Sequence, residues 1–257
     1  MMRSIIRHSF FKRSLLTIIA IVLLFAVWRA AAWYIGAEII LPTPLQTGKE
    51  LASLMATGNF WVAVGMSALR VLLGFIISMT AGLLVGVAAG YSDVFYRLVR
   101  PFLTVIRTIP AISIILLALI WFKTGLVPVF VSLLLGFPII TGNVIEGIRN
   151  VDKKLLEMAN VYHIPVGKQL RHIYIPSVLP FFTAGASTAV GIAWKVVVTA
   201  EVLSQPVHAL GTGLQIAKVQ LETPRMFAWT ITGIAFGALF ESVFTLLTKL
   251  LRKRRVR

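Results

Sequence analysis

The sequence predicts an all-α polytopic membrane protein with six transmembrane helices. Hydrophobic residues make up 58% of its 257 residues and charged residues only 13%, and the mean hydropathy is +0.90. A soluble domain has about a quarter charged residues, and one domain of this length has too little interior to bury so many apolar side chains. Apolar runs of about 20 residues, which can cross a hydrocarbon core of roughly 30 Å, recur along the chain. These runs lack the alternation of polar and apolar residues that is typical of barrel strands.

The predicted transmembrane domain covers residues 15–250, between an N-terminal segment 1–14 and a basic tail 251–257. Its six apolar segments are residues 15–35, 61–90, 102–122, 127–145, 178–203 and 227–247. The first segment also has features of a cleavable signal peptide, because basic residues precede it and Ala30-Ala31-Ala32 lies near its end. Bulky apolar residues continue as far as Ile35, so we expect this segment to stay in place as a membrane anchor.

The basic residues set the expected topology. A formal charge of +16 is compatible with a nucleic-acid binder. However, most of the Lys and Arg residues fall on one side of the six-helix topology, in the N-terminus, between Arg97 and Arg107, in the loop 146–177 and in the tail. Because Lys and Arg are enriched in cytoplasmic loops, we expect both ends of the chain in the cytoplasm. The basic tail is then expected to contact anionic lipid headgroups, with no nucleic-acid partner.

The sequence lacks the residues and motifs of several kinds of functional site. There is no cysteine, which excludes a disulfide framework and a cysteine metal site. Gly48-Lys49 is followed by Glu50, so the Gly-Lys-Ser/Thr ending of a phosphate-binding loop is absent. No cluster of His or carboxylate residues suggests a metal site or an intramembrane hydrolase. We therefore expect a protein that is not an enzyme and has no cofactor or metal in this chain.

The loop 146–177 is the longest on the predicted cytoplasmic side. Residues 155–162 have the pattern of a short amphipathic helix, and residues 164–167 predict a turn because Pro165 disfavours helix in the residue before it. Residues 168–175 predict a second short helix, closed by Pro176. Two short helices that lie along a membrane face suit a docking surface. The alternative is an ordinary amphipathic connector.

This loop resembles the coupling loop of bacterial ABC importer permeases, whose pattern is E-A-A-x3-G-x9-I-x-L-P. The spacing matches throughout, with the pattern positions occupied by Glu157, Met158, Ala159, His163, Ile173, Ile175 and Pro176. Met158 replaces an alanine, Ile175 replaces a leucine and His163 replaces the glycine. In the family that glycine turns the chain between the two helices, so we expect Ile164-Pro165 to supply the turn here.

The resemblance extends over residues 41–250, to the nitrate, taurine and alkanesulfonate branch of these permeases. Four further motifs carry it, in the order expected: Leu41-Pro42-Thr43-Pro44, Ser67-Ala68-Leu69-Arg70, Arg107-Thr108-Ile109-Pro110-Ala111 and Ala193-Trp194. It implies the type I ABC importer permease fold in a bacterial inner membrane. It also implies a homodimer of permeases, an external solute-binding protein and two cytoplasmic ATPases that bind the ATP and receive the loop 146–177 in a groove.

The resemblance implies import of a small polar solute, most simply an anion such as a sulfonate, taurine or nitrate. Related permeases also serve thiamine-pyrimidine precursors, which is one alternative. A membrane scaffold or regulator that uses the same loop without forming a pathway is another. The sequence of this subunit does not identify the solute, because specificity in this family lies largely on the binding protein.

Charged residues inside the predicted spans are candidates for function, because they are costly in a bilayer. They are Arg70, Lys195, Glu201 and Glu241. Counting from the helix ends places Arg70 and Lys195 at a similar depth, Glu201 near the outer surface, and Glu241 too deep to pair easily with Lys195. Two cations at one depth could attract an anion. Alternatively, Arg70 binds neighbouring carbonyls or carboxylates and holds the helices together, and Lys195 pairs with Glu201 across a dimer.

Small residues and prolines indicate how the helices pack. Gly82, Gly86 and Gly90 lie on one face of the second span, and such a face allows a neighbouring helix to approach closely. Four prolines are expected to end or kink the central helices, namely Pro101, Pro110, Pro128 and Pro138.

Overall fold

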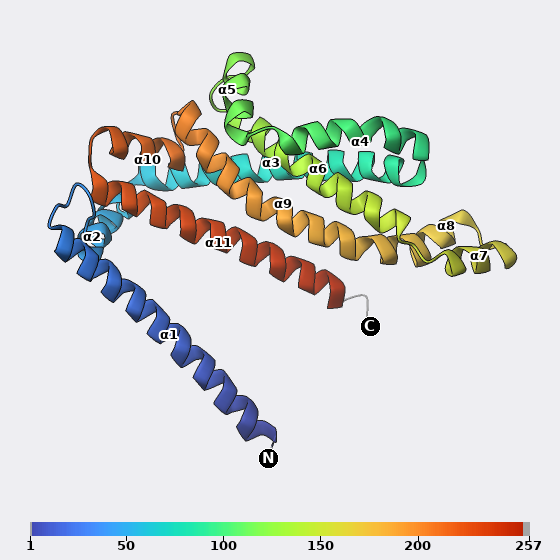
Figure 1. Cartoon of the computed structure of the whole chain (residues 1–257), viewed down its shortest axis with the longest axis horizontal. Helices are drawn as coiled ribbons and strands as arrows, with labels where there is room; N and C mark the ends of the chain where they lie inside the picture. Colours follow the sequence, from blue (N-terminus) through green and yellow to red (C-terminus); the bar gives the residue numbers. More distant parts are fainter. Residues whose placement is uncertain (1, 254–257) are drawn as a thin grey trace. The chain divides into compact units, whose positions relative to one another are not determined.

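A computed structural model describes residues 2–253, with the side chains of residues 16–248. Helices are the only regular structure in that range, which confirms the all-α class (Figure 1). They are α1 (Met2–Ile35), α2 (Pro44–Met55), α3 (Gly58–Tyr91), α4 (Asp93–Thr108), α5 (Ala111–Trp121), α6 (Val127–Arg149), α7 (Lys153–Val161), α8 (Val166–Gln169), η1 (Leu170–Tyr174), α9 (Ile175–Ser204), α10 (Leu210–Val219) and α11 (Thr223–Lys253). Residues 254–257 of the predicted basic tail, and the basic side chains expected in 1–14, lie outside the description.

Within residues 2–253, five helical segments are long and apolar enough to cross a membrane. They are Leu16–Ile35, Gly58–Tyr91, Val127–Arg149, Val166–Ser204 and Thr223–Thr248. The predicted third span, 102–122, is not one helix, because α4 and α5 meet at an angle of 100°. The break has a local cause: Pro110 follows Ile109, whose ψ of 128° is extended, and a residue that precedes proline disfavours the helical conformation. The α4–α5 pair is therefore a broken span or a re-entrant segment.

The chain forms two compact units, Met1–Phe60 with Gly213–Ile231 and Trp61–Thr212 with Thr232–Arg257. Aromatic contacts and hydrogen bonds from side chains to backbone carbonyls hold the first unit together. The Trp28 indole N–H donates to the Pro42 carbonyl at 3.0 Å, and its ring stacks on Phe227 with centroids 5.8 Å apart. The Thr223 hydroxyl donates to the Ile39 carbonyl at 2.7 Å. These contacts fix the connection between α1 and α2 against the start of α11.

In the second unit, α3 packs closely against α6 through the predicted glycine face. A Cβ atom on Gly82 would lie 2.9 Å from the Cβ of Ile140, and one on Gly86 would lie 2.7 Å from the Cβ of Val144. Such separations are below van der Waals contact, so side chains at these glycines would push the helices apart. The packing role of Gly82, Gly86 and Gly90 is confirmed.

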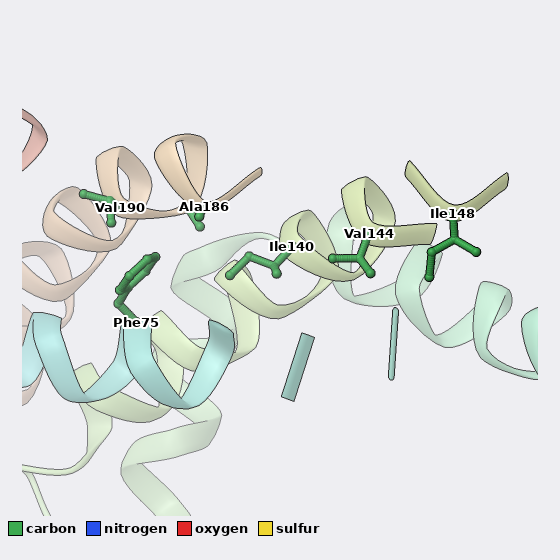
Figure 2. Close-up of a cluster of buried hydrophobic side chains, with 7 residues drawn as sticks. Phe75, Ile140, Val144, Ile148, Ala186 and Val190 are labelled. Atoms are coloured by element: carbon green, nitrogen blue, oxygen red, sulfur yellow. The ribbon is translucent and has the colours of Figure 1, made fainter. Parts of the chain in front are cut away.

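Helix α9 completes the core of this unit. Figure 2 shows Phe75 of α3 and Ala186 and Val190 of α9 with the α6 residues Ile140, Val144 and Ile148. Burial of apolar side chains in lipid does not itself bring helices together, so close packing of small and branched residues carries this contact. The three-helix core positions the segments that carry both groups of predicted site residues.

Candidate functional site

The first half of the predicted coupling loop forms α7, whose inner face packs on the start of the next helix. Asp152 caps α7 by accepting a hydrogen bond from the Lys154 N–H at 2.9 Å, as expected for an N-cap residue. Ala159 is fully buried and packs with Val151 and Ile173. The structure therefore brings together two residues of the predicted motif, Ala159 and Ile173, that are 14 positions apart.

The turn after α7 lies at His163, the residue that replaces the family's glycine. His163 has a φ of +49°, which is the left-handed conformation that glycine adopts most easily. The Ile164 N–H donates to the Ala159 carbonyl at 2.8 Å and the His163 N–H to the Asn160 carbonyl at 3.1 Å, which is the hydrogen-bond pair of a Schellman helix end. The expectation that Ile164-Pro165 would replace this turn is corrected, since His163 itself makes it.

The second half of the loop is not an isolated short helix. Helix α8, the π-helical turn η1 and α9 follow one another without a break, so that Val166–Ser204 is a single helical segment. Pro176 lies in the first turn of α9, and the predicted helix end at Pro176 is wrong. The wider turn of η1 just before it accommodates the missing N–H and the ring of the proline.

The outer face of the loop is exposed and partly apolar. Glu157 is exposed, and so are the large apolar side chains of Leu155, Met158, Val161 and Tyr162, the last with 75% of its surface accessible. Apolar side chains gathered on an exposed loop are typical of a surface that binds another protein. These five exposed residues, 155, 157, 158, 161 and 162, form the predicted docking face of the loop.

A second group of predicted residues forms a buried polar cluster between α3 and α9. The Arg70 guanidinium Nη1 lies 2.8 Å from the Glu201 carboxylate and also donates to the His208 carbonyl at 2.8 Å. The Ser67 hydroxyl lies 2.8 Å from Glu201 Oε2, and the Gly211 N–H donates to the same oxygen at 3.2 Å. The carboxylate is thus surrounded by donors from α3 and from the start of α10.

Two expectations about the intramembrane charges are corrected by this cluster. Arg70 and Glu201 are paired at 2.8 Å although counting from the predicted helix ends placed them at different depths, so such counts do not give the relative depth of residues on different helices. The expected pairing of Lys195 with Glu201 is replaced by the pair of Arg70 and Glu201, in which Glu201 is fully buried. Lys195 on α9 and Glu241 on α11 are exposed, and neither forms an ion pair within residues 16–248.

One charged residue of the spans was missed. Arg107 was grouped with the cytoplasmic cations, but its guanidinium donates to the Pro138 carbonyl at 2.5 Å, and Pro138 is the central residue of α6 (Val127–Arg149). Helix α4 thus returns along α6 into the membrane-spanning region. The signal that could have found it is the polar stripe Tyr96, Arg100, Thr104 and Arg107, whose spacing of three or four residues places it on one face of a helix.

The comparisons with known proteins agree with the sequence resemblance. Residues 78–257 match the family described as "Binding-protein-dependent transport system inner membrane component". The putative aliphatic sulfonates transport permease protein SsuC of Bacillus subtilis is 30% identical over 97% of this chain and 89% of its own length. The taurine transport system permease protein TauC of Escherichia coli is 24% identical over 91% of this chain and 85% of its own length.

Solved structures show the same fold. A crystal structure of an amino acid ABC transporter with histidines matches with a TM-score of 0.64 at 19% identity, over 79% of this chain and 97% of the matched chain. An inward-facing MetNI methionine ABC transporter matches with a TM-score of 0.56 at 17% identity, over 74% of this chain and 93% of the matched chain. These similarities confirm the ABC importer permease fold. The family match and the SsuC relative show a multi-span membrane transport subunit. The chain belongs to the family of inner membrane components of binding-protein-dependent transport systems.

Proposed function

We propose that this permease forms the pathway of an ATP-driven importer for small sulfonate or taurine-like anions. The observation that carries the proposal is the 30% identity to an aliphatic sulfonates permease over 97% of the chain. Exposed cations in the spans support it, because a charged side chain in a membrane segment commonly faces a water-filled cavity or a partner. Lys195 and Arg107 are both exposed and have the sign that an anion requires.

The loop with Glu157, Met158, Ala159, His163, Ile173 and Pro176 couples this pathway to a separate ATPase. Its docking face binds the ATPase, while buried Ala159 rests on Ile173 at the base of the Val166–Ser204 helix. ATP shifts the conformational equilibrium because it binds the closed ATPase pair better than the open pair. Movement of α7 with the ATPase is then passed to α9 through the contact of Ala159 with Ile173.

The assembly contains two copies of this permease, two ATPases and an external solute-binding protein, with both permease termini in the cytoplasm. The charge of the loop supports this orientation. Lys153, Lys154, Lys168 and Arg171 are all exposed on the segment that contains the docking face. Such an excess of cations is typical of cytoplasmic loops.

The substrate is tested by uptake. The permease is reconstituted in liposomes with its ATPase and binding protein, and entry of radiolabelled taurine and methanesulfonate is measured with ATP. We expect ATP-dependent uptake of at least one of them and none with an ATPase that cannot hydrolyse ATP. Uptake of a thiamine-pyrimidine precursor together with no uptake of either sulfonate would overturn the proposed substrate class.

The coupling role is tested by Glu157→Lys. We expect this variant to lose uptake and solute-stimulated ATP hydrolysis while its thermal unfolding midpoint stays unchanged, because substitutions of exposed residues alter stability by only about 0.5 kcal/mol. Arg97→Glu, a charge reversal at another exposed position outside the loop, serves as the control and should retain uptake. Normal uptake by Glu157→Lys would count against the docking face.

A further inference from the structure

We propose that the groove between α4 and α6 binds a small oxyanion, with Arg107 as its innermost ligand. The groove is a cavity of about 550 Å³, within the range of 300–1,000 Å³ found for small-molecule sites. The inference deepens the proposed function, on which the choice of a sulfonate as the probe rests. It places a binding site for the anion in the cytoplasmic half of the permease.

Two antiparallel helices build the groove. The α4 residues Arg100, Thr104 and Arg107 line one side, and the α6 residues Gly142, Glu146 and Arg149 line the other. The absence of a side chain at Gly142 leaves room for the Arg107 guanidinium, which lies against it. The ionisable groups that face the cavity are thus three arginines, one glutamate and Tyr96, and their net charge favours an anion.

The three arginines are not equally available. Arg149 is bound to Asp93 at 2.6 Å and lies 3.9 Å from the centre of the Tyr96 ring. Arg100 and Arg107 form no ion pair within the described part of the chain. Arg107 has one described hydrogen bond, from Nη2 to the Pro138 carbonyl, and a guanidinium has five N–H donors. Most donors of Arg107 therefore remain for a ligand.

The chemistry of the donors indicates an oxyanion. A guanidinium presents parallel N–H groups that fit two oxygens of a sulfonate, sulfate, phosphate or carboxylate group. Tyr96 also lines the cavity, and its phenol hydroxyl is a hydrogen-bond donor. Because Arg149 is paired with Asp93, the other charged groups of the lining are Arg100, Arg107 and Glu146, and their net charge of one positive unit matches a monovalent anion better than a polyvalent one.

The depth of Arg107 favours a free anion over a lipid headgroup. Pro138, its partner, precedes Arg149 at the inner end of α6 by 11 residues, which corresponds to about 16 Å along the helix. That distance is about half of a hydrocarbon core of roughly 30 Å. Lipid phosphates lie outside the core, so a headgroup would meet Arg149 and Arg100 before it reached Arg107.

The site is tested by ligand-dependent stability of the permease–ATPase complex, without binding protein, in phosphatidylcholine nanodiscs. Methanesulfonate is titrated against chloride at equal ionic strength, and the unfolding midpoint of the permease is followed. A ligand that binds the folded state raises this midpoint. For Arg107→Gln we expect the concentration needed for a given rise to increase about tenfold or more, because a hydrogen bond to a charged group is lost.

Two matched variants make the result specific. Arg97→Gln removes an exposed α4 cation that does not line the groove, and should respond to methanesulfonate like the wild type. Arg107→Lys keeps the positive charge, so it controls for loss of the response through misfolding, and it should show an intermediate response. Equal responses of Arg107→Gln and the wild type would overturn the proposal, since they would reflect general stabilisation by the salt.

A second experiment distinguishes a free oxyanion from the headgroup of an anionic lipid. The titration is repeated in nanodiscs that contain phosphatidylglycerol, and lipids bound to the complex are identified by mass spectrometry. Retention of the methanesulfonate response supports the proposal. Specific phosphatidylglycerol binding that is lost in Arg107→Gln, together with no response to methanesulfonate, would overturn it. This assay does not depend on transport. Binding of methanesulfonate in the groove can therefore be detected even if the uptake assay identifies another solute, and uptake of a sulfonate can be detected even if the groove binds nothing.

Discussion

Two arginines in the spanning segments of this permease have opposite surroundings. Arg70 is 6% exposed and is paired with the buried carboxylate of Glu201 at 2.8 Å. Arg107 is exposed, and its described partner is the backbone carbonyl of Pro138. A cation that its own chain neutralises holds helices together, whereas a cation with no carboxylate remains available to a ligand. Sequence position alone does not distinguish them.

The largest effect is expected for Arg70→Met. It leaves the Glu201 carboxylate buried without its cation, which costs about 3–5 kcal/mol, a large part of the stability of about 5–15 kcal/mol of a folded protein. We expect little folded permease, measured as the yield of monodisperse protein and the unfolding midpoint. The double variant Arg70→Met/Glu201→Met should recover folding, because an apolar pair can replace a buried ion pair. A stable single variant that lacks only transport would instead make Arg70 a pathway residue.

Arg107→Gln should have the opposite profile. It removes one hydrogen bond to a carbonyl, so we expect the free energy of unfolding to fall by only about 1 kcal/mol. Uptake of the anion in liposomes should fall about tenfold, because a charged contact to the solute is lost. The control is Arg97→Gln on the same helix, with uptake unchanged. If Arg107→Gln were as unstable as Arg70→Met, Arg107 would have the same structural role as Arg70.

The variant Lys195→Met tests whether exposed cations of the spans in general contribute to transport of the anion. Lys195 is exposed on α9, and its carbonyl accepts a hydrogen bond from the Thr199 hydroxyl at 2.8 Å. If exposed intramembrane cations serve the anion, this variant folds normally and takes up the anion several-fold more slowly. Lys49→Met, outside the spanning helices, is the matched control. Unchanged rate and selectivity would leave Arg107 alone in that role.

The smallest effect is expected at His163, where conformation and not charge decides. Its left-handed φ of +49° costs roughly 1 kcal/mol or more for a residue other than glycine. Replacing His163 by glycine removes this cost, but part of the gain in stability is offset by the greater flexibility of glycine in the unfolded chain. His163→Gly should therefore stabilise the end of α7 by up to about 1 kcal/mol. Slower hydrogen exchange at the Ile164 amide would show this. His163→Ala should give no gain.

The sequence was sufficient for features that depend on local pattern. Apolar length located five of the six predicted spans. The spacing of Gly82, Gly86 and Gly90 identified the packed face of α3, and the amphipathic segment 155–162 matched α7 within two residues at its start. Proline placement predicted breaks but not their size, since Pro110 gives a bend of 100° while Pro176 is absorbed in a continuous helix by the turn η1.

Features that depend on how helices lie against one another were not accessible in this way. Glu201 and Arg70 are 131 positions apart, and no periodicity relates them. Their depths were counted from predicted helix ends, which assumed that all ends are level. Arg107 was assigned to the cytoplasm for the same reason, because the polar stripe of α4 marks one face of a helix but does not show that this helix returns along α6. In both cases the error lies in tertiary placement and not in the identity of the helix.

The continuous helix Val166–Ser204 has 39 residues, which corresponds to about 58 Å at the rise of an α-helix. At one end Ile173 supports α7, and near the other Glu201 binds Arg70 and the start of α10. One helical segment thus connects these two points, so a displacement of α7 in the proposed coupling would act on the segment that also carries Glu201. The polar cluster of Glu201 therefore holds the outer end of the same helical segment whose other end supports α7.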